Sequence, residues 1–285
     1  MPFVTNGTEN GHPIELYYED HGAGRPVVLL QGYPLDGAAW EPQTLALLDA
    51  GYRVITVDRR GFGRSTRVAS PFGYDELADD VAVLLEHLDL SDATLVGFSM
   101  GTAEVARYAG RHGTGRLRSA VMIAAFGPGL LLGEDGVGFP DAVFTGIQDA
   151  IRADRHQYLE NYFLQHYVAE QNLGTRVSEA TLRADTTVGA AAGAAAMLSC
   201  VAAWKEDFRS DLPAIDVPLL VLHGTEDRNI PIDVGARRIP QYVPHATVVE
   251  VAGGPHGIGV THREIVTPAL LEFLAEATGQ RVPRS

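Results

Sequence analysis

The stretch that most constrains this chain runs from a short apolar segment, through a serine framed by glycines, into a run of small residues. Residues 93–96 are apolar, as in a buried strand, and residues 97–101 read Gly-Phe-Ser-Met-Gly, which fits the pattern G-x-S-x-G. Residues without a Cβ let a strand and a helix approach closely around such a turn. The stretch therefore predicts a nucleophile elbow with Ser99 at a helix N-terminus, where the dipole favours developing negative charge.

Two residues in the last third of the chain are candidates for activating this serine. A serine hydroxyl is a weak nucleophile until a base removes its proton and a carboxylate orients that base. After an elbow, these partners follow in the order serine, acid, histidine. Asp227 and His256 each lie just beyond an apolar strand segment, and glycines flank His256. We therefore predict a triad of Ser99, Asp227 and His256, with Glu226 as the rival acid.

Nine other histidines compete with His256 for the role of the base. His223 stands at a strand end and is interpreted as structural, and His245 lies in a turn that contains proline. The remaining seven are interpreted as surface or helix positions: His12, His21, His87, His112, His156, His166 and His262. None is spaced with carboxylates in the manner of metal ligands, so the sequence predicts no metal site.

The tetrahedral intermediate of acyl transfer needs two backbone donors for its oxyanion. Met100 follows the nucleophile, and its N–H is the first candidate donor. Tyr33 lies in the breaker-rich turn after the apolar segment 27–30, and its N–H is the second. Pro34 has no N–H and fixes φ near about −65°, so it shapes this loop without donating. We expect Tyr33, Pro34 and Met100 to contact the substrate.

Apolar strand segments alternate with helical patterns on both sides of the elbow. Helical spacing occurs in residues 40–50, 77–88 and 270–277. Strand patterns occur in residues 14–19, 27–30, 53–57, 93–96, 120–125, 218–222 and 247–251. This alternation predicts an α/β fold with a mostly parallel, doubly wound sheet.

The alternation stops at Gly127 and resumes after Asp211. The intervening sequence carries only helical patterns, at 142–153, 156–168 and 189–204. We therefore predict a helical cap, residues 127–211, inserted between two late strands of a core made of residues 1–126 and 212–285. Such a cap would cover the carboxyl edge of the sheet, where open α/β sheets bind ligands. Its bulky residues are expected either to set acyl size or, for at least half of them, only to pack the cap against the core: Phe144, Tyr162, Phe163, Met197 and Trp204.

Charge and cysteine content limit the partners and the compartment of the chain. It has 22 basic and 36 acidic residues, a net charge of −14, which opposes binding to nucleic acid. Cys200 is the only cysteine, so an intrachain disulfide is excluded. The first ten residues lack the layout of a signal peptide, and no apolar run reaches the roughly 20 residues of a spanning helix. We expect a cytoplasmic protein without a membrane partner.

Taken together, several motifs resemble the α/β-hydrolase superfamily, in its branch of bacterial cofactor-free haloperoxidases, perhydrolases and arylesterases. The motifs are Gly-Tyr-Pro-Leu-Asp-Gly at 32–37, the segment 51–65 that ends Arg-Gly-Phe-Gly-Arg-Ser, Gly-Phe-Ser-Met-Gly at 97–101, Asn-Leu-Gly-Thr-Arg-Val-Ser at 172–178 and Pro-His-Gly at 255–257. The resemblance covers nearly the whole chain. It implies an α/β-hydrolase fold and a serine esterase that also forms peracids with hydrogen peroxide, without haem, vanadium, flavin or any other cofactor.

One position departs from the family pattern. Gln31 stands where the family usually has histidine before the oxyanion-loop glycine, and both side chains can donate and accept a hydrogen bond. Three functions stay open: an esterase with perhydrolase activity, a lactonase, amidase or thioesterase on the same triad, and a non-catalytic relative that binds a small ligand under its cap. The expected partner is a small ester or carboxylic acid, with hydrogen peroxide as a candidate second substrate. A homo-oligomer also stays open.

Overall fold

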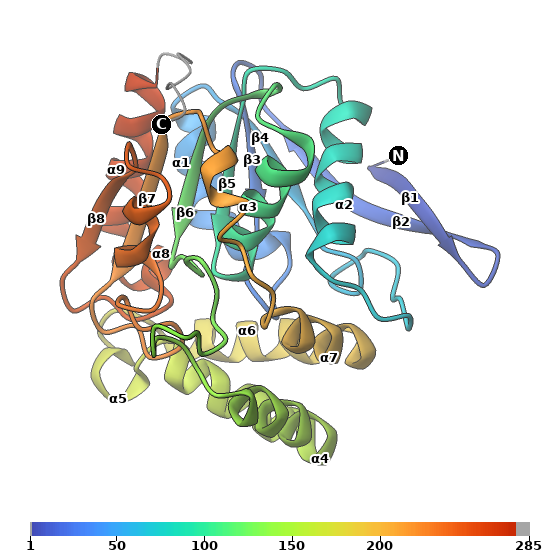
Figure 1. Ribbon diagram of the computed structural model, residues 1–285, viewed down its shortest axis with the longest axis vertical. Coiled ribbons are helices and arrows are strands. Elements are labelled where there is room, and N and C mark those ends of the chain that lie inside the picture. Colours follow the sequence, from blue (N-terminus) through green and yellow to red (C-terminus); the bar gives the residue numbers. More distant parts are fainter. Residues whose placement is uncertain (1, 278–285) are drawn as a thin grey trace.

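The computed structural model describes residues 2–277, which fold around a twisted sheet (Figure 1). Across the sheet the described strands follow the order β1-β2-β4-β3-β5-β6-β7-β8. The pairs β1–β2 and β2–β4 are antiparallel, and every other neighbouring pair is parallel. The strands are β1 Phe3–Glu9, β2 His12–His21, β3 Pro26–Leu30, β4 Arg53–Val57, β5 Ala93–Phe98, β6 Leu117–Ile123, β7 Leu219–Gly224 and β8 Thr247–Val251.

Alternate residues of the central strands face two separate cores. In β3, Val28 and Leu30 join the core under α2 (Tyr74–His87) and α3 (Met100–His112), whereas Val27 and Leu29 join the core on the opposite side. The second core is covered by η1 (Gly37–Trp40), α1 (Glu41–Asp49), α8 (Ile258–Thr261) and α9 (Arg263–Glu276). Period-two alternation in strands buried on both faces produces this arrangement. The predicted mostly parallel, doubly wound α/β sheet is confirmed.

Three elements differ most from the sequence-based expectation: β1, α9, and the helix expected over 189–204, which is broken between α6 (Glu179–Ala191) and α7 (Ala194–Ala203). Strand β1 was not predicted, because only Val4 is buried in it and the exposed hairpin shows little apolar alternation. Helix α9 begins at Arg263, earlier than the expected 270, and holds Pro268 inside it. Its buried residues repeat every four positions, as in one face of a helix: Val266, Leu270 and Leu274.

Four helices separate β6 from β7, and Figure 1 shows them together beyond one end of the sheet. They are α4 Asp141–His166, α5 Ala169–Asn172, α6 Glu179–Ala191 and α7 Ala194–Ala203. Helix α4 is kinked at Asp154, whose carboxylate accepts the N–H groups of His156 and Gln157 as an N-cap does, so it consists of the two expected helices. We propose residues 127–211 as a cap unit inserted into the core.

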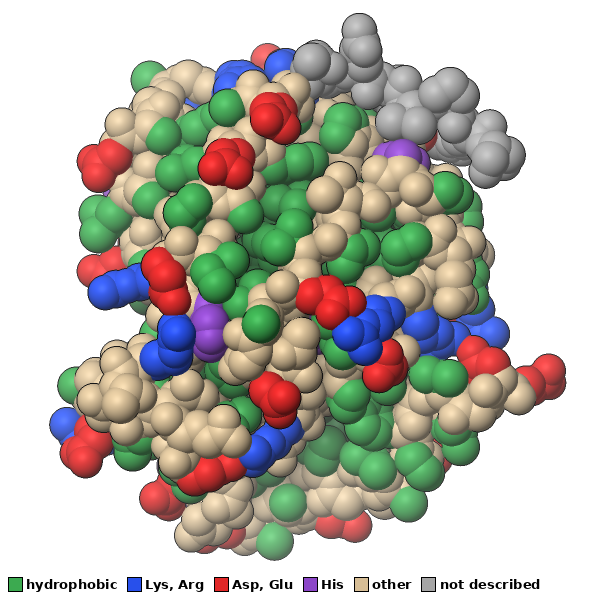
Figure 2. Space-filling view, turned by 90° about the vertical axis from the view of Figure 1, so that its left-hand side faces the viewer, with side chains coloured by type: hydrophobic (Ala, Val, Ile, Leu, Met, Phe, Trp, Pro, Cys, Tyr) green, Lys and Arg blue, Asp and Glu red, His purple; other side chains and the backbone are tan. Residues whose placement is uncertain are grey.

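Charged side chains lie where the cap meets the core. Arg176 pairs with Glu264 at 2.7 Å and Arg228 pairs with Glu170 at 2.6 Å, and each pair joins a cap residue to a core residue. Figure 2 shows acidic and basic side chains gathered across the middle of this face of the molecule, beside a hollow in its surface.

Within residues 2–277 no single helix has the length and hydropathy needed to cross a membrane. Helices α6 and α7 meet that test only when taken as a pair, and they are bent by 97° relative to one another.

Candidate active site

Ser99 occupies a sharp turn between β5 and α3. Its φ of 51° and ψ of −116° lie in a region that residues with a Cβ rarely adopt. The turn is closed tightly, because a Cβ on Gly97 would stand 2.4 Å from the carbonyl oxygen of Gly101. The N–H of Ser99 donates to the carbonyl of Ile123 at 2.8 Å and so ties the turn to β6. The strand, turn and helix expected around Ser99 are all present.

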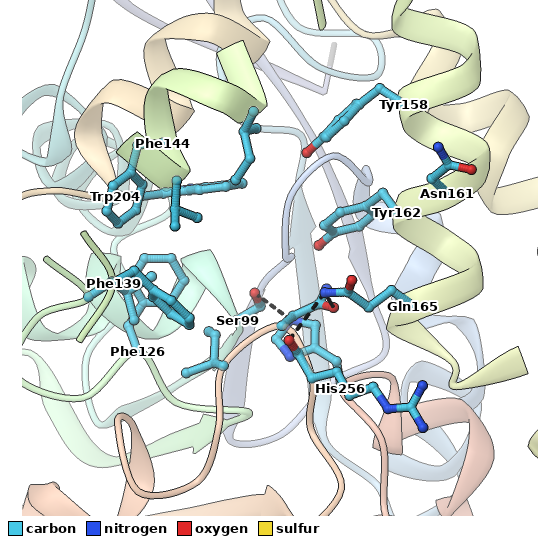
Figure 3. Close-up of a pocket in the computed structure, with 16 residues that line it drawn as sticks. Ser99, Phe126, Phe139, Phe144, Tyr158, Asn161, Tyr162, Gln165, Trp204 and His256 are labelled. Carbon is cyan, nitrogen blue, oxygen red and sulfur yellow. Dashed lines mark hydrogen bonds between the residues drawn. The ribbon is translucent and has the colours of Figure 1, made fainter. Parts of the chain in front are cut away.

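The three side chains predicted as a triad form one series of hydrogen bonds, of which Figure 3 shows the bond between Ser99 and His256. Nε2 of His256 lies 2.8 Å from Oγ of Ser99, and its Nδ1 lies 2.7 Å from Oδ2 of Asp227. Asp227 follows β7 and His256 follows β8, so parallel strands deliver both to the edge of the sheet that carries Ser99. All three residues are at least 95% buried. The structure brings them together, and their catalytic role stays a prediction.

Asp227 has the environment of a permanently charged carboxylate. Its Oδ1 accepts the backbone N–H groups of Asn229 at 2.9 Å and Ile230 at 2.8 Å. Burial by itself raises the pKa of Asp227, but the charge of His256 and hydrogen bonds from His223 and His256 hold that pKa well below its usual value. The rival Glu226 has an exposed side chain. Asp227 is therefore placed to orient His256 and to balance a positive charge on it.

His166 is the residue near Ser99 whose surroundings differ most from the sequence-based interpretation. It was interpreted as a surface or helix position, and it does end α4, but its side chain is only 1% exposed. Its ring centroid lies 5.0 Å from that of His256. A signal existed in the sequence, because Leu159 and Phe163 precede His166 at helical spacing and are fully buried.

Two more histidines can be compared with their interpretation from the sequence. His262 was interpreted as a surface or helix position but is buried, whereas His223 has the structural role expected of it. His262 is 3% exposed and its Nδ1 lies 2.9 Å from the hydroxyl of Thr261. Nδ1 of His223 accepts the N–H of Ala125 at 3.0 Å, and its Nε2 donates to the carbonyl of Ile230 at 2.9 Å. These bonds brace the loop that carries Asp227.

The loop expected to supply the second oxyanion donor is fixed through its backbone. The carbonyl of Gln31 accepts Nη2 of Arg59 at 2.5 Å, and the buried Arg59 pairs with Glu104. The carbonyl of Tyr33 accepts the hydroxyl of Tyr162 at 2.9 Å. These contacts bind the loop to the core on one side and to α4 on the other, while Nε2 of Gln31 has no partner within residues 2–277.

Met100 is the first residue of α3, where helical N–H groups have no acceptor within their own helix. Its N–H therefore has no acceptor within α3, and the prediction that Met100 and Tyr33 supply the two oxyanion donors stays a prediction. The structure changes the expected way in which Tyr33, Pro34 and Met100 contact a substrate. The side chains of Tyr33, Pro34 and Met100 are buried and do not line the pocket, because the loop and α3 pack them inward. Any contact that these residues make with a substrate is through their backbone.

A pocket of about 340 Å³ opens above Ser99 and His256. Figure 3 shows an aromatic wall facing a second wall formed by the last turns of α4. The first wall includes Phe126, Phe139, Phe144 and Trp204, and the second includes Tyr158, Asn161, Tyr162 and Gln165. Of the five bulky cap residues expected here, Phe163 and Met197 do not line the pocket, because they are fully buried in the packing of the cap.

Within residues 2–277, no group of three or more His, Cys, Asp or Glu side chains is arranged to hold a metal ion. Cys200 lies on α7 with no exposed surface. Burial raises the pKa of its thiol to about 12, so the thiol stays protonated at neutral pH. Such a buried, protonated thiol fills space as a small apolar residue does.

Comparison with known proteins gives matches over nearly the full chain. The profile described as the alpha/beta hydrolase fold matches residues 25–262. The chain is 40% identical to the non-heme chloroperoxidase CPO-A1 of Kitasatospora aureofaciens, over 96% of this chain and 99% of that protein. It is 33% identical to the bifunctional esterase/perhydrolase DCH of Acinetobacter calcoaceticus, with the same coverage. The bromoperoxidase structure from Bacillus anthracis superposes with a TM-score of 0.90 at 40% identity, covering 94% and 98% of the two chains.

Proposed function

Because this chain belongs to the α/β-hydrolase family, we propose that it is a serine hydrolase that cleaves carboxylic esters through an acyl-enzyme. The observation that carries the proposal is the series of hydrogen bonds from Ser99 through His256 to Asp227 at the floor of the pocket. A non-catalytic relative would have no need to keep this geometry in a strained turn. The activity is tested by the release of 4-nitrophenol from a series of 4-nitrophenyl esters.

Each residue has a defined part in the proposed reaction. Oγ of Ser99 attacks the ester carbonyl while Nε2 of His256 takes its proton, and the carboxylate of Asp227 balances the imidazolium. The N–H groups of Met100 and Tyr33 bind the oxyanion. His256 then gives the proton to the departing alcohol. Water attacks the acyl-enzyme in the second half of the reaction, and the same groups act in reverse.

We propose further that hydrogen peroxide replaces water in the second half of the reaction, so that a peracid leaves. The support is the similarity to relatives named as haloperoxidases and as an esterase/perhydrolase. The carbonyl of Tyr33 already accepts the hydroxyl of Tyr162, and a carbonyl oxygen has a second lone pair. That lone pair can accept the additional O–H that peroxide has and water lacks. Halide oxidation then occurs in solution, by the released peracid.

This route predicts that bromination of a phenolic dye requires both hydrogen peroxide and a carboxylate such as acetate. The peracid carries the oxidising equivalents. Acetic acid acylates Ser99 with release of water, and hydrogen peroxide then takes the acetyl group to form the peracid. The rate of dye bromination is measured with each component omitted in turn, and with Ser99→Ala as the control. Bromination that continues in a buffer without any carboxylate contradicts the route.

The aromatic wall of the pocket predicts which esters the enzyme prefers. Phe144 is 3% exposed and Trp204 is 9% exposed, and both line the pocket, so truncating either enlarges the space beside Ser99. Phe144→Ala and Trp204→Ala should each move the best 4-nitrophenyl ester to a longer acyl chain. We expect kcat/KM for an ester about two methylenes longer to rise about tenfold relative to the acetate, since each added methylene is worth about 0.8 kcal/mol when buried.

The matched control for this prediction is Phe163→Ala. Phe163 is an equally buried aromatic residue of α4, but it does not line the pocket. Its truncation should lower the melting temperature and leave the preferred chain length unchanged. If Phe144→Ala and Trp204→Ala behave like Phe163→Ala, these side chains only pack the cap against the core.

A lactonase, amidase or thioesterase would use the same groups on a different acyl compound. Simple lactones, anilides and thioesters with the same acyl group separate these activities from that of an esterase. We expect kcat/KM to be highest for the ester, because the alcohol of an ester departs with less acid catalysis than the amine of an anilide requires. A lactone or thioester turned over at least tenfold faster would assign the protein to that class instead.

A further inference from the structure

The imidazole of His256 belongs to a cluster of three rings drawn from three separate parts of the chain. Phe98, which precedes Ser99, has its ring centroid 5.3 Å from that of His256. His166, at the end of α4, is 5.0 Å from His256 with the ring planes at 84°. Phe98 and His166 are themselves 5.8 Å apart. The ring of His256 therefore packs against Phe98 from the elbow and against His166 from the cap.

Beside His256, backbone and ring contacts fix the position of His166. Its carbonyl accepts the N–H of Gly257, the residue after His256, at 3.1 Å. The approach is close, because a Cβ on Gly257 would stand 2.8 Å from the His166 ring. The rings of Tyr162, Phe163 and Tyr167 surround the other sides of His166. The end of α4 is thus packed directly on the loop that positions the proposed base.

His166 packs against His256 as an uncharged ring. Burial lowers the pKa of His166 well below its usual value, and the neighbouring His256 lowers it further, while Asp227 acts in the opposite direction. Its Nδ1 has no hydrogen-bond partner within residues 2–277. The contact between His166 and His256 therefore depends on the shape of the His166 ring. It also places no second positive charge beside His256, whose imidazole becomes protonated during the reaction.

The need for this contact changes during the proposed reaction. In the free enzyme two hydrogen bonds anchor the imidazole, one to Ser99 at 2.8 Å and one to Asp227 at 2.7 Å. Once Oγ of Ser99 is acylated it has no proton to donate, so the first of these anchors is lost. Nε2 must nevertheless stay aimed at the attacking water. During deacylation, the hydrogen bond to Asp227 and the ring contacts of Phe98 and His166 remain to restrain the tilt of the imidazole.

We propose that His166 is a positioning residue, supplied by the cap, that holds the ring of His256 in place for deacylation. This inference rests on the acyl-enzyme mechanism proposed above. Misplacing a catalytic group by about 1 Å can cost up to about 100-fold in rate. For the loss of one of two ring contacts we expect about a tenfold slower deacylation, with acylation changed less than about threefold.

The test is burst kinetics with 4-nitrophenyl acetate on His166→Ala, His166→Asn and His166→Phe. In the two variants without a similar ring, the rate constant of deacylation should fall about tenfold, so that kcat and KM fall together while kcat/KM stays within about threefold. The burst of 4-nitrophenol should rise toward one per active site, because acyl-enzyme accumulates. His166→Phe keeps a ring and removes the unpartnered nitrogen, so its deacylation rate should return to within about threefold of the original.

Leu159→Ala is the control for general damage to α4. Leu159 is fully buried on the same helix and lies outside the ring cluster, so its truncation should lower the melting temperature without changing the ratio of acylation to deacylation. The proposal is overturned if kcat/KM falls as far as kcat, if deacylation is unchanged in His166→Ala and His166→Asn, or if His166→Phe is as slow as they are. Absence of any ester turnover in the unaltered protein would instead overturn the proposed function, and this inference with it.

Discussion

Ser99→Ala should lower kcat for ester hydrolysis by about 10⁴ to 10⁶, the range that loss of a triad nucleophile costs in other serine hydrolases. The hydroxyl is the only group of Ser99 that changes, and its hydrogen bond to His256 is the first link of the proposed series. Alanine can occupy the same turn, since it keeps a Cβ and tolerates the positive φ no worse than serine does. The loss should therefore reflect chemistry and not unfolding.

A serine-directed phosphonate gives an independent measurement of the same residue. Mass spectrometry should show one adduct per chain in the original protein, with parallel loss of activity, and none in Ser99→Ala. Circular dichroism and the melting temperature of the variant serve as the controls for folding. Complete labelling of Ser99→Ala would show that another residue is the nucleophile.

Asp227→Asn should produce the second largest effect, a fall in kcat of about 10⁴, which is the cost of the same change in a well-studied triad. An amide removes the negative charge that balances the imidazolium, and its NH₂ group can replace the acceptor that holds Nδ1–H of His256. The two backbone N–H groups of Asn229 and Ile230 would also lose a charged acceptor. The tautomer and the orientation of His256 are then no longer fixed.

Glu226→Gln is the matched control for this prediction. It neutralises the adjacent carboxylate, whose side chain is exposed, and kcat should stay within about threefold of the original. Initial rates with one 4-nitrophenyl ester are compared for the two variants at the same pH. If Glu226→Gln is the crippling change and Asp227→Asn is mild, then Glu226 is the acid and the assignment to Asp227 is wrong.

The sequence determined the fold class and the three residues that meet at the candidate site. Strands buried on both faces appear as continuous apolar runs, and the elbow needs glycine at a fixed spacing from Ser99, so both leave short-range patterns. Asp227 and His256 could be found because parallel strands end at one edge of the sheet, and a residue just after a strand is therefore placed by the topology. These signals depend on neighbours within a few residues.

Only the tertiary structure decided which residues surround those three. The helical stripe of α4 indicates that His166 faces inward, but nothing in that stripe indicates that the surface it covers is the loop of Gly257 and His256, about 90 residues away. For the same reason Phe144 lines the pocket while Phe163, on the same helix, does not. Periodicity records that a side chain is buried, whereas its partner depends on how segments distant in the chain pack together, and that packing leaves no local pattern.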